Sequence, residues 1–191
     1  MVDDQFAGVS ITAQRAGDDE TSENDAMIFD SNNVTGGDHD LEFDGQGNIL
    51  IISEDNDSSD ADDNAGGGTI TFDFDDPSEV VSINLLDIEE AGGTVDLLDD
   101  NGDLIRSVDI PVTGDGEQQE LAIDTAGVST MNVNFVGSGA IDDLCYVPPS
   151  EDPEDCGDQY DVHYLGGIPM LPPVDDEDLP PEEAFEFMDV E

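Results

Sequence analysis

Apolar and polar residues alternate along several short stretches of the chain, most clearly after Thr69. Ile70, Phe72 and Phe74 share one face of this segment, and hydroxyl and acidic residues occupy the other. A period of two is typical of a strand with one face on a core and the other in water. Further β-forming segments, bounded by turn residues, follow at 80–88, 94–98 and 104–110. The central part of the chain is therefore predicted to be a meander of antiparallel strands.

Two turns are predicted within this meander. Asp75-Asp76-Pro77 separates two β-forming segments and predicts a turn between two strands. Asn101-Gly102 lies between two apolar segments, a pair that favours a two-residue type I′ hairpin turn because both central residues need positive φ.

The remaining β-forming segments complete an all-β pattern without an amphipathic helix. They lie at 6–14, 26–29, 48–53, 120–124, 130–136 and 139–147. About ten short strands with closely spaced turns predict two packed antiparallel sheets, a β-sandwich with a jelly roll as the favoured topology. We expect this domain to span residues 1–147.

Residues 148–191 are rich in Pro, Asp and Glu and are predicted to form a tail. The tail contains two apolar segments, 160–165 and 184–190. Such segments either fold back on their own domain, stay unstructured, or add to a sheet edge of a neighbouring subunit. Phe185, Phe187 and Met188 are the residues that we expect to support self-association in the third case.

The charge of the chain is extreme. Asp and Glu number 51 against two arginines, and the formal net charge is −49. Nucleic acids and anionic membranes are excluded as electrostatic partners, since both bind through clustered Lys and Arg. No apolar run is long enough to insert into a membrane. Either the surface is a halophilic adaptation, or some carboxylates converge on divalent cations such as Ca²⁺, which takes six to eight oxygen ligands.

Two acidic loops, each directly after an apolar strand, are the best candidates for a calcium site. The candidate ligands are Asp30, Asp38 and Asp40 in the first loop, and Asp55 and Asp57 in the second. The second loop begins like a calcium-binding loop, with acids at its first and third positions. It then departs from that motif, because Asp60 replaces the turn glycine and Gly66 replaces the bidentate glutamate.

The two cysteines, Cys145 and Cys156, predict a disulfide that joins the tail to the last strand. Closing so short a loop would contribute about 3 kcal/mol by the chain-entropy model. The N-terminus has neither a basic region nor an apolar run. If the protein is exported, we expect its secretion signal to lie outside this sequence.

Several motifs resemble a β-sandwich module of secreted bacterial surface and adhesion proteins. They lie at 27–31, 35–38, 47–55, 63–74 and 137–146. The last of them is also similar to the final strand of calcium-containing, jelly-roll carbohydrate-binding modules. In those modules an aspartate at the position of Asp142 helps to hold a structural calcium. The shorter acidic loop after Ile52 and the Pro-rich tail depart from the pattern, so the resemblance implies an extracellular location and a fold more than an activity.

Together these features predict a secreted, calcium-binding β-sandwich that acts as a structural or adhesive surface component. Non-catalytic binding of a surface polysaccharide is the first alternative, and a salt-adapted domain without a metal site is the second. Exposed aromatic platforms for sugars are scarce, since the chain has no Trp and three Tyr. We do not expect an enzyme: His39 lies between two aspartates, and no Ser or Cys stands in a nucleophile motif.

Overall fold

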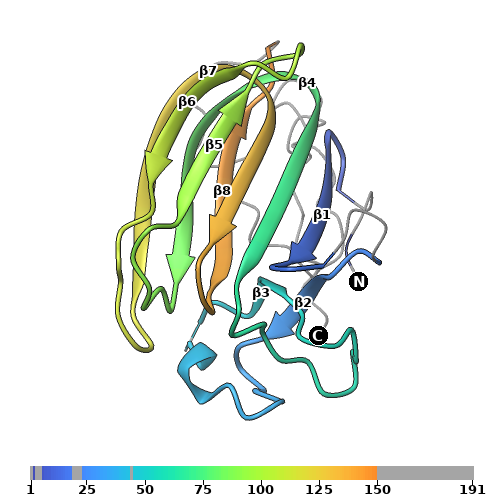
Figure 1. Cartoon of the computed structure of the whole chain (residues 1–191), viewed down its shortest axis with the longest axis vertical. Coiled ribbons are helices and arrows are strands. Elements are labelled where there is room, and N and C mark those ends of the chain that lie inside the picture. The colour runs from blue at the N-terminus through green and yellow to red at the C-terminus, as the bar shows by residue number, and fades with distance from the viewer. Residues whose placement is uncertain (1, 3–5, 19–22, 44, 150–191) are drawn as a thin grey trace, which may run out of the picture.

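A computed structural model describes residues 2, 6–18, 23–43 and 45–149, and these residues form an antiparallel β-sandwich (Figure 1). The predicted all-β class is confirmed. The strands are β1 (Val9–Arg15), β2 (Ala26–Asp30), β3 (Asn48–Ile52), β4 (Gly68–Leu86), β5 (Thr94–Leu98), β6 (Leu104–Asp109), β7 (Gln118–Phe135) and β8 (Ala140–Val147). A single 3-10 turn, η1 (His39–Leu41), accompanies them in this part of the chain.

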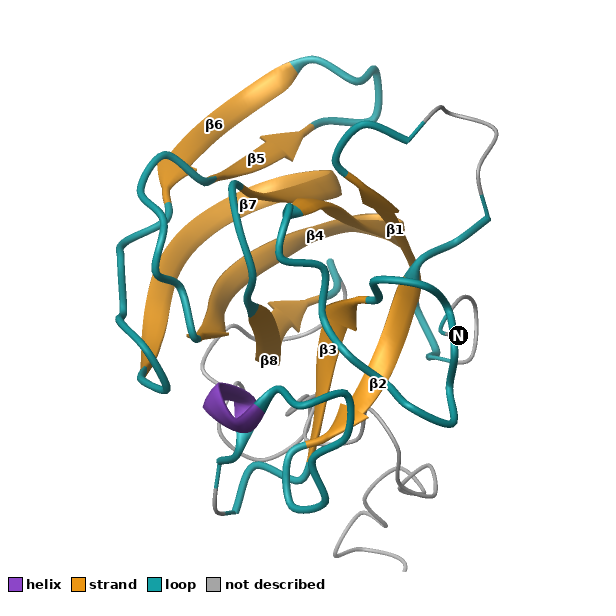
Figure 2. Ribbon diagram, turned by 60° about the horizontal axis from the view of Figure 1, so that its bottom comes forward, coloured by secondary structure: helices purple, strands orange, loops and turns teal. Residues whose placement is uncertain are grey.

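Two long strands, β4 and β7, pair with each other along most of their length and run through both layers of the sandwich (Figure 2). The first half of β4 pairs with β1, and the second half of β7 pairs with β5, which in turn pairs with β6. The second half of β4 pairs with β8, which continues to β3 and β2. Each layer therefore contains one half of each long strand.

The turn predicted at Asp75–Pro77 is wrong, because β4 continues through it. The register between β4 and β7 shifts between Asp73 and Ser78, where the strand bends from one layer into the other. A bulge tolerates proline, which lacks a ladder donor, so the same residues that favour a turn also suit a bent strand. In the same way, the segments predicted at 120–124 and 130–136 form one strand, with positive φ at Asp124, where the first segment ends, and at Gly127, which lies between them.

The hairpin at Asn101-Gly102 is confirmed, but its type I′ turn is not. Gly102 has a φ of 78°, whereas Asn101 is not among the residues with positive φ. The Gly102 N–H donates to the Asp99 carbonyl at 3.0 Å, and the Asp99 N–H donates to the Asp103 carbonyl at 3.0 Å. A longer loop with one left-handed glycine is the result, and the Asp99 carboxylate caps it by accepting from the N–H groups of Asn101 and Asp103.

The core lies between the two layers and consists of the inward-facing residues of nearly all strands. Phe72, Ile11 and Met131 are at most 2% exposed in its main cluster. A smaller cluster around Phe29 and Leu41 lies beneath the loop that follows β2. Removing a side chain such as Phe72 should cost about 3–5 kcal/mol.

The division into a domain at 1–147 and a tail at 148–191 stays a prediction, because residues 150–191 lie outside the described part. The residues predicted to support assembly, Phe185, Phe187 and Met188, fall in that range. Among the described residues, none of the helical structure is long and apolar enough to cross a membrane.

Candidate functional site

Polar side chains form two rows across the outer face of the layer that contains β1. In the first row, Gln14 lies opposite Thr69, which lies opposite Asn134, which lies opposite Thr94. In the second row, the corresponding residues are Thr12, Thr71, Asn132 and Asp96. The alternation of each strand places these side chains outward, while their neighbours fill the core. The face presents amide and hydroxyl groups from four strands, together with the carboxylate of Asp96.

Hydrogen bonds between strands hold the amides of this face in fixed orientations. Thr69 Oγ1 donates to Asn134 Oδ1 at 2.9 Å, and Thr71 Oγ1 donates to Asn132 Oδ1 at 2.9 Å. The Asn134 Nδ2 donates in turn to Thr94 Oγ1 at 3.1 Å and to Asp96 Oδ2 at 3.0 Å. Because both amide oxygens accept from threonine, both amide nitrogens are turned away from β4.

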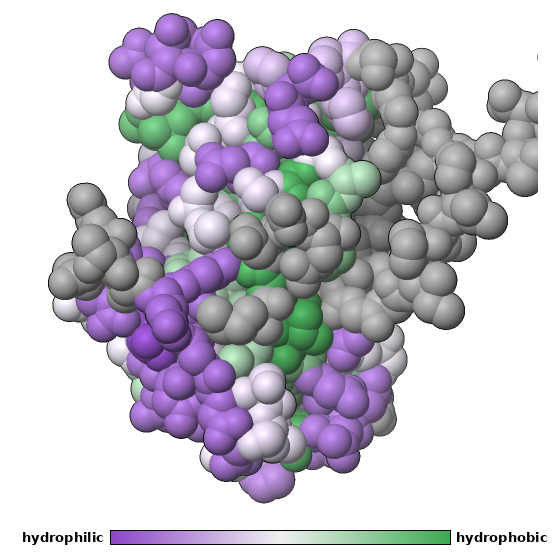
Figure 3. Space-filling model, turned by 90° about the vertical axis from the view of Figure 1, so that its right-hand side faces the viewer, coloured by the Kyte–Doolittle hydropathy of each residue, from purple (hydrophilic) through white to green (hydrophobic). Residues whose placement is uncertain are grey.

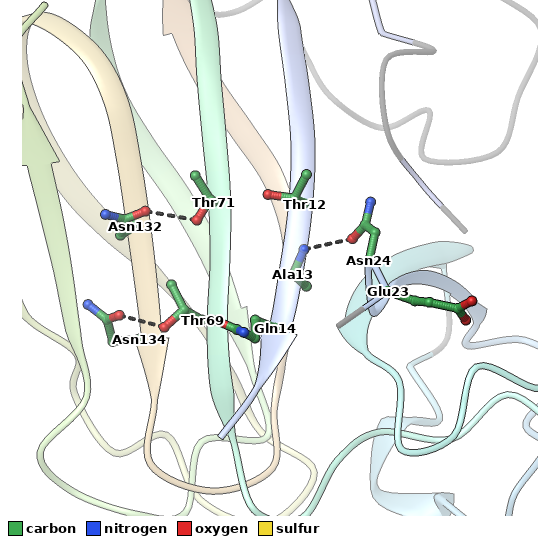
Figure 4. Close-up of a pocket in the computed structure, with 9 residues that line it drawn as sticks. All are labelled: Thr12, Ala13, Gln14, Glu23, Asn24, Thr69, Thr71, Asn132 and Asn134. Atoms are coloured by element: carbon green, nitrogen blue, oxygen red, sulfur yellow. Dashed lines mark hydrogen bonds between the residues drawn. The ribbon is translucent and has the colours of Figure 1, made fainter. Parts of the chain in front are cut away.

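A cavity of about 480 Å³ lies over β1, β4 and β7 on this face (Figure 4). Its floor is formed by residues of the two rows, and Glu23 and Asn24 form a wall beside β1. Asn24 is held in place because its Oδ1 accepts from the Ala13 N–H at 2.8 Å. The volume is within the range of small-molecule sites, and the lining carries one carboxylate, that of Glu23.

A second polar feature lies at one end of the sandwich, where the loops after β2, β3, β4 and β6 approach one another. Asp40, Asp87 and Asp115 each place one carboxylate oxygen within 4.8 Å of the other two. Asp87 directly follows β4 and is 1% exposed, while the other two are exposed. The Gly116 N–H donates to Asp87 Oδ1 at 2.8 Å and joins the two loops. Three carboxylates in this arrangement suit a hard cation.

Burial raises the pKa of Asp38, Asp62, Asp63 and Asp87 at this end of the molecule, and the shifts are large for Asp63 and Asp87. The pKa of Asp87 is raised to about 6, chiefly by burial, and the nearby Asp40, Glu89 and Asp115 add to the shift. The pKa of Asp63 is raised to about 7, again chiefly by burial. The hydrogen bond that Asp63 accepts from the Gly139 N–H at 2.7 Å lowers this pKa, but by less than burial raises it. Negative charge is therefore concentrated here without a cationic side chain to offset it among the groups that shift these pKa values.

The six predicted metal ligands do not come together in one site. Asp38 and Asp40 lie in the loop that reaches the acidic end, and Asp38 Oδ2 accepts from the Asp63 N–H at 2.8 Å, which links the two predicted loops. The other predicted ligands, Asp30, Asp55, Asp57 and Asp142, have different surroundings.

Three of these aspartates cap their own turns. Asp30 Oδ1 accepts from the Asn32 N–H at 3.1 Å, and Asp55 Oδ1 accepts from the Asp57 N–H at 2.8 Å. Asp57 Oδ1 accepts from both the N–H and the hydroxyl of Ser59. These two bonds lower the pKa of Asp57. Such Asx turns are a common use of aspartate in loops.

Asp142, the ligand implied by the resemblance, is 1% exposed and lies on β8 opposite Asn84. Its role as a ligand stays a prediction. Cys145 on the same strand is disulfide-bonded. Cys156, its predicted partner, lies outside the described residues.

At the end of β1 lies a buried carboxylate that, unlike those at the acidic end, is paired with a cationic side chain. Arg15 Nη2 is 2.9 Å from Asp25 Oδ1, and the Asp25 side chain is 0% exposed. The same guanidinium donates to the backbone carbonyls of Ser53 at 3.2 Å and Glu54 at 2.5 Å. It also contacts the Asp18 carboxylate at 3.1 Å. One cationic side chain thus joins three segments of the chain.

Sequence reasoning missed Asp63, Asp87 and Asp115 as well as the rows of threonine and asparagine. Asp87 and Asp115 are far from the predicted loops in sequence, and 51 acids make each of them uninformative alone. For the polar face, the outward threonines of β4 are visible in the alternation after residue 68. Their pairing with the asparagines of β7 depends on the sheet register, which the sequence does not contain.

No protein-family model and no curated protein matches this chain. Solved structures of similar fold include a Streptococcus pneumoniae fucose binding module, with 15% identity, 41% of this chain and 60% of that chain covered, and a TM-score of 0.32. The structure of TmCBM61 in complex with β-1,4-galactotriose has 16% identity, 74% and 88% coverage, and a TM-score of 0.37. An enzymatically active domain of tailspike protein 4 of bacteriophage CBA120 has 15% identity, 74% and 19% coverage, and a TM-score of 0.34.

The chain spans 60% of the length of the fucose binding module. At these identities and TM-scores no ligand is transferred from one protein to another, so the function has to be inferred from the residues of this chain.

Proposed function

We propose that this protein is a non-catalytic module that binds a neutral polysaccharide through its polar face, as an adhesive component outside the cell. The observation that supports this most directly is the pair of Thr and Asn rows beneath the cavity. Sugar hydroxyls are both donors and acceptors, and amide and hydroxyl side chains match both roles.

The orientation of the amides favours this proposal over a merely solvated surface. Threonine hydroxyls hold Asn132 and Asn134 by their oxygens, so that neither amide rotates freely. Groups that are already ordered lose less conformational freedom when a ligand binds. The Asn132 Nδ2 has no hydrogen-bond partner among the described residues, and it points along the face in Figure 4. It is a donor available to a ligand.

The charge of the chain narrows the ligand class. A net charge of −49 repels uronic acid polymers, sulfated polymers and other polyanions. A neutral polymer meets no such barrier, and the cavity lining carries the single carboxylate of Glu23. From the side of the molecule on which β1 lies, the visible described residues are hydrophilic over large areas, with an apolar region between them (Figure 3). Because this face has no aromatic side chain among the residues that line the cavity, the binding of a sugar polymer there depends on hydrogen bonds.

The test is affinity electrophoresis of the full chain against a panel of neutral and anionic polysaccharides at about 1 M NaCl, where the Debye length is about 3 Å. We expect retardation by at least one neutral polymer. Asn132→Ala should weaken it about tenfold, which is the loss of roughly one hydrogen bond to the ligand. Asn101→Ala, at the tip of the β5–β6 hairpin, is the matched control and should leave it unchanged. Equal binding by the two variants, or binding of anionic polymers alone, would contradict the proposal.

We further propose that Ca²⁺ is held at the acidic end by Asp40, Asp87 and Asp115 and supports the loops there. The donor set fits, since carboxylates are the ligands that Ca²⁺ prefers and one of the three is fixed by the Gly116 N–H. Calorimetric titration of metal-free protein with CaCl₂ at high NaCl tests this. Asp115→Asn should abolish the heat of the tightest site, and Asp100→Asn should not. Equal stabilisation by NaCl and CaCl₂ at matched ionic strength would favour the salt-adapted alternative.

A further inference from the structure

The two outer strands of the layer that contains the polar face have very different edges. The backbone of β1 is capped by side chains of the segment before β2. Asn24 Oδ1 accepts from the Ala13 N–H, its Nδ2 donates to the Ile11 carbonyl at 3.3 Å, and Asp25 Oδ2 accepts from the Arg15 N–H at 3.0 Å. An edge protected in this way cannot accept a further strand.

The strand at the other end, β6, has no such cover among the described residues. It is the last strand in the sheet order and pairs with β5. Most of its residues are exposed, including Leu104 at 61% and Ile105 at 42%. No described side chain caps its backbone as Asn24 caps that of β1. An exposed edge with large apolar side chains is a template for an added strand.

The charge along β6 differs from that of the rest of the molecule. Between Asp103 and Asp109 there is no acidic residue, and Arg106 lies in the middle. The Arg106 Nη1 donates to the Ile123 carbonyl, so its positive charge lies at the open side of the sandwich. The acidic surface of the rest of the molecule repels an acidic segment. β6 is a more favourable edge for such a segment because it carries Arg106.

We propose that residues 184–190 of the same chain add to β6 as a further strand. This segment, Ala-Phe-Glu-Phe-Met-Asp-Val, lies in the range 150–191 outside the described residues. Phe185 and Phe187 fall on one face of an extended chain, as do Ala184, Met188 and Val190 on the other. The rings can cover Leu104 or Ile105, and the acidic residues of the segment face the one exposed strand that carries a cation.

From the sequence, both folding back and self-association are open for this segment, and the open edge in the same chain favours the intramolecular contact. Residues 148–183 connect the last strand to the segment, and a polypeptide of that length reaches roughly 30 Å even when unstructured. A tethered segment of this kind has an effective concentration on the order of 1 mM. A second copy reaches that level only in very concentrated solution, and it brings a further net charge of −49.

Hydrogen–deuterium exchange of the full chain tests the proposal, read on peptides that cover residues 104–109. With Phe185→Ser and Phe187→Ser together, exchange of β6 should become about tenfold faster, because the tethered strand is released. The matched control is Tyr160→Ser with Tyr164→Ser, in the other apolar segment of the tail, and it should leave β6 unchanged. Light scattering should give a monomer throughout.

The acceptor strand is tested from its own side by Leu104→Ser with Ile105→Ser, which should release protection of residues 184–190. Both positions are exposed, so the fold does not depend on them. Three outcomes would overturn the proposal: β6 exchange that ignores the Phe variants, β6 exchange that responds to the Tyr variants instead, or a dimer that dissociates in the Phe variants. The last outcome would assign the same edge to a second copy.

Discussion

Asp25 and Asp87 are almost equally buried, at 0% and 1% exposure, but among the described residues only Asp25 has a cationic partner. Asp25 is paired with the guanidinium of Arg15 and also accepts from Asn56 Nδ2 at 2.9 Å. Asp87 accepts from one backbone N–H and has the carboxylates of Asp40 and Asp115 beside it. Arg15 therefore neutralises the charge of Asp25, whereas the charge of Asp87 depends on the pH and on cations from the solution.

Breaking the Arg15–Asp25 pair should have the largest effect. With Arg15→Met, the Asp25 carboxylate stays buried without its counter-charge, and the carbonyls of Ser53 and Glu54 lose their donor. Removal of one partner of a buried pair typically costs about 3–5 kcal/mol. Urea unfolding at fixed high salt measures the loss.

Arg106→Met is the matched control, because it removes the other arginine from an exposed strand and leaves no buried carboxylate behind. Its cost should be smaller. It consists of the bonds to the Ile123 carbonyl and the Thr125 hydroxyl, on the order of 1 kcal/mol, and of the positive charge that we propose favours residues 184–190 at β6. If the two variants were equally stable, Arg15 would stabilise the protein only by reducing its net negative charge. The ion pair with Asp25 would then contribute nothing, and the contrast between Asp25 and Asp87 would disappear.

The difference between the two regions explains how far sequence reasoning reaches. The strands are predictable because apolar residues alternate with polar ones where one face of a strand is buried, as at Ile70, Phe72 and Phe74. The continuity of β4 through Pro77 is not, since a bulge and a turn use the same residues. The acidic end is not predictable either. It joins Asp40, Asp87 and Asp115 from three loops, and only the sheet topology brings them together.

Calcium should stabilise the protein by the next largest amount. An ion at a hundred times its dissociation constant stabilises the folded state by about 2.7 kcal/mol. Asp115→Asn should remove most of this gain, since Asp115 is an exposed member of the cluster and not part of the core. Thermal unfolding with CaCl₂ or NaCl at equal ionic strength gives the comparison. Loss of the gain in Asp142→Asn but not in Asp115→Asn would place the ion at the last strand instead, as the sequence resemblance implies.

The free energy of unfolding should depend on pH because of carboxyl groups that are buried without a cationic partner, Asp63 above all. Because the pKa of Asp63 is raised to about 7 from an ordinary value of 3.8, the folded state binds a proton that the unfolded state releases. The stabilisation from this group is complete below pH 4 and is lost as the pH rises towards 7. One proton changes the free energy of unfolding by at most about 1.4 kcal/mol per pH unit. Unfolding in EDTA at pH 5, 6 and 7 measures the slope.

Asp63→Asn should flatten that slope, because an amide accepts the Gly139 N–H without titrating. The same substitution in the presence of saturating Ca²⁺ should matter less if the bound ion already offsets the negative charge around Asp38 and Asp40. A slope that is unchanged in Asp63→Asn would mean that other carboxyls, and not this one, govern the pH response.

The smallest effect is expected at Asp99, a carboxylate that backbone donors satisfy without any cation. Its Oδ1 accepts from the N–H groups of Asn101 and Asp103, both at 2.9 Å, and these bonds lower its pKa. A lowered pKa reverses the sign found for Asp63: the stabilisation is present at neutral pH and is lost as the pH falls below 4. Asp99→Asn retains an acceptor oxygen and should be close to the parent protein, whereas Asp99→Ala should lower the unfolding temperature by less than any variant above. If Asp99→Asn lowered the unfolding temperature as much as Asp99→Ala, the negative charge of Asp99 would stabilise the hairpin. Capping of backbone N–H groups would then not be a third way of accommodating a carboxylate, beside the ion pair of Asp25 and the candidate cation site of Asp87.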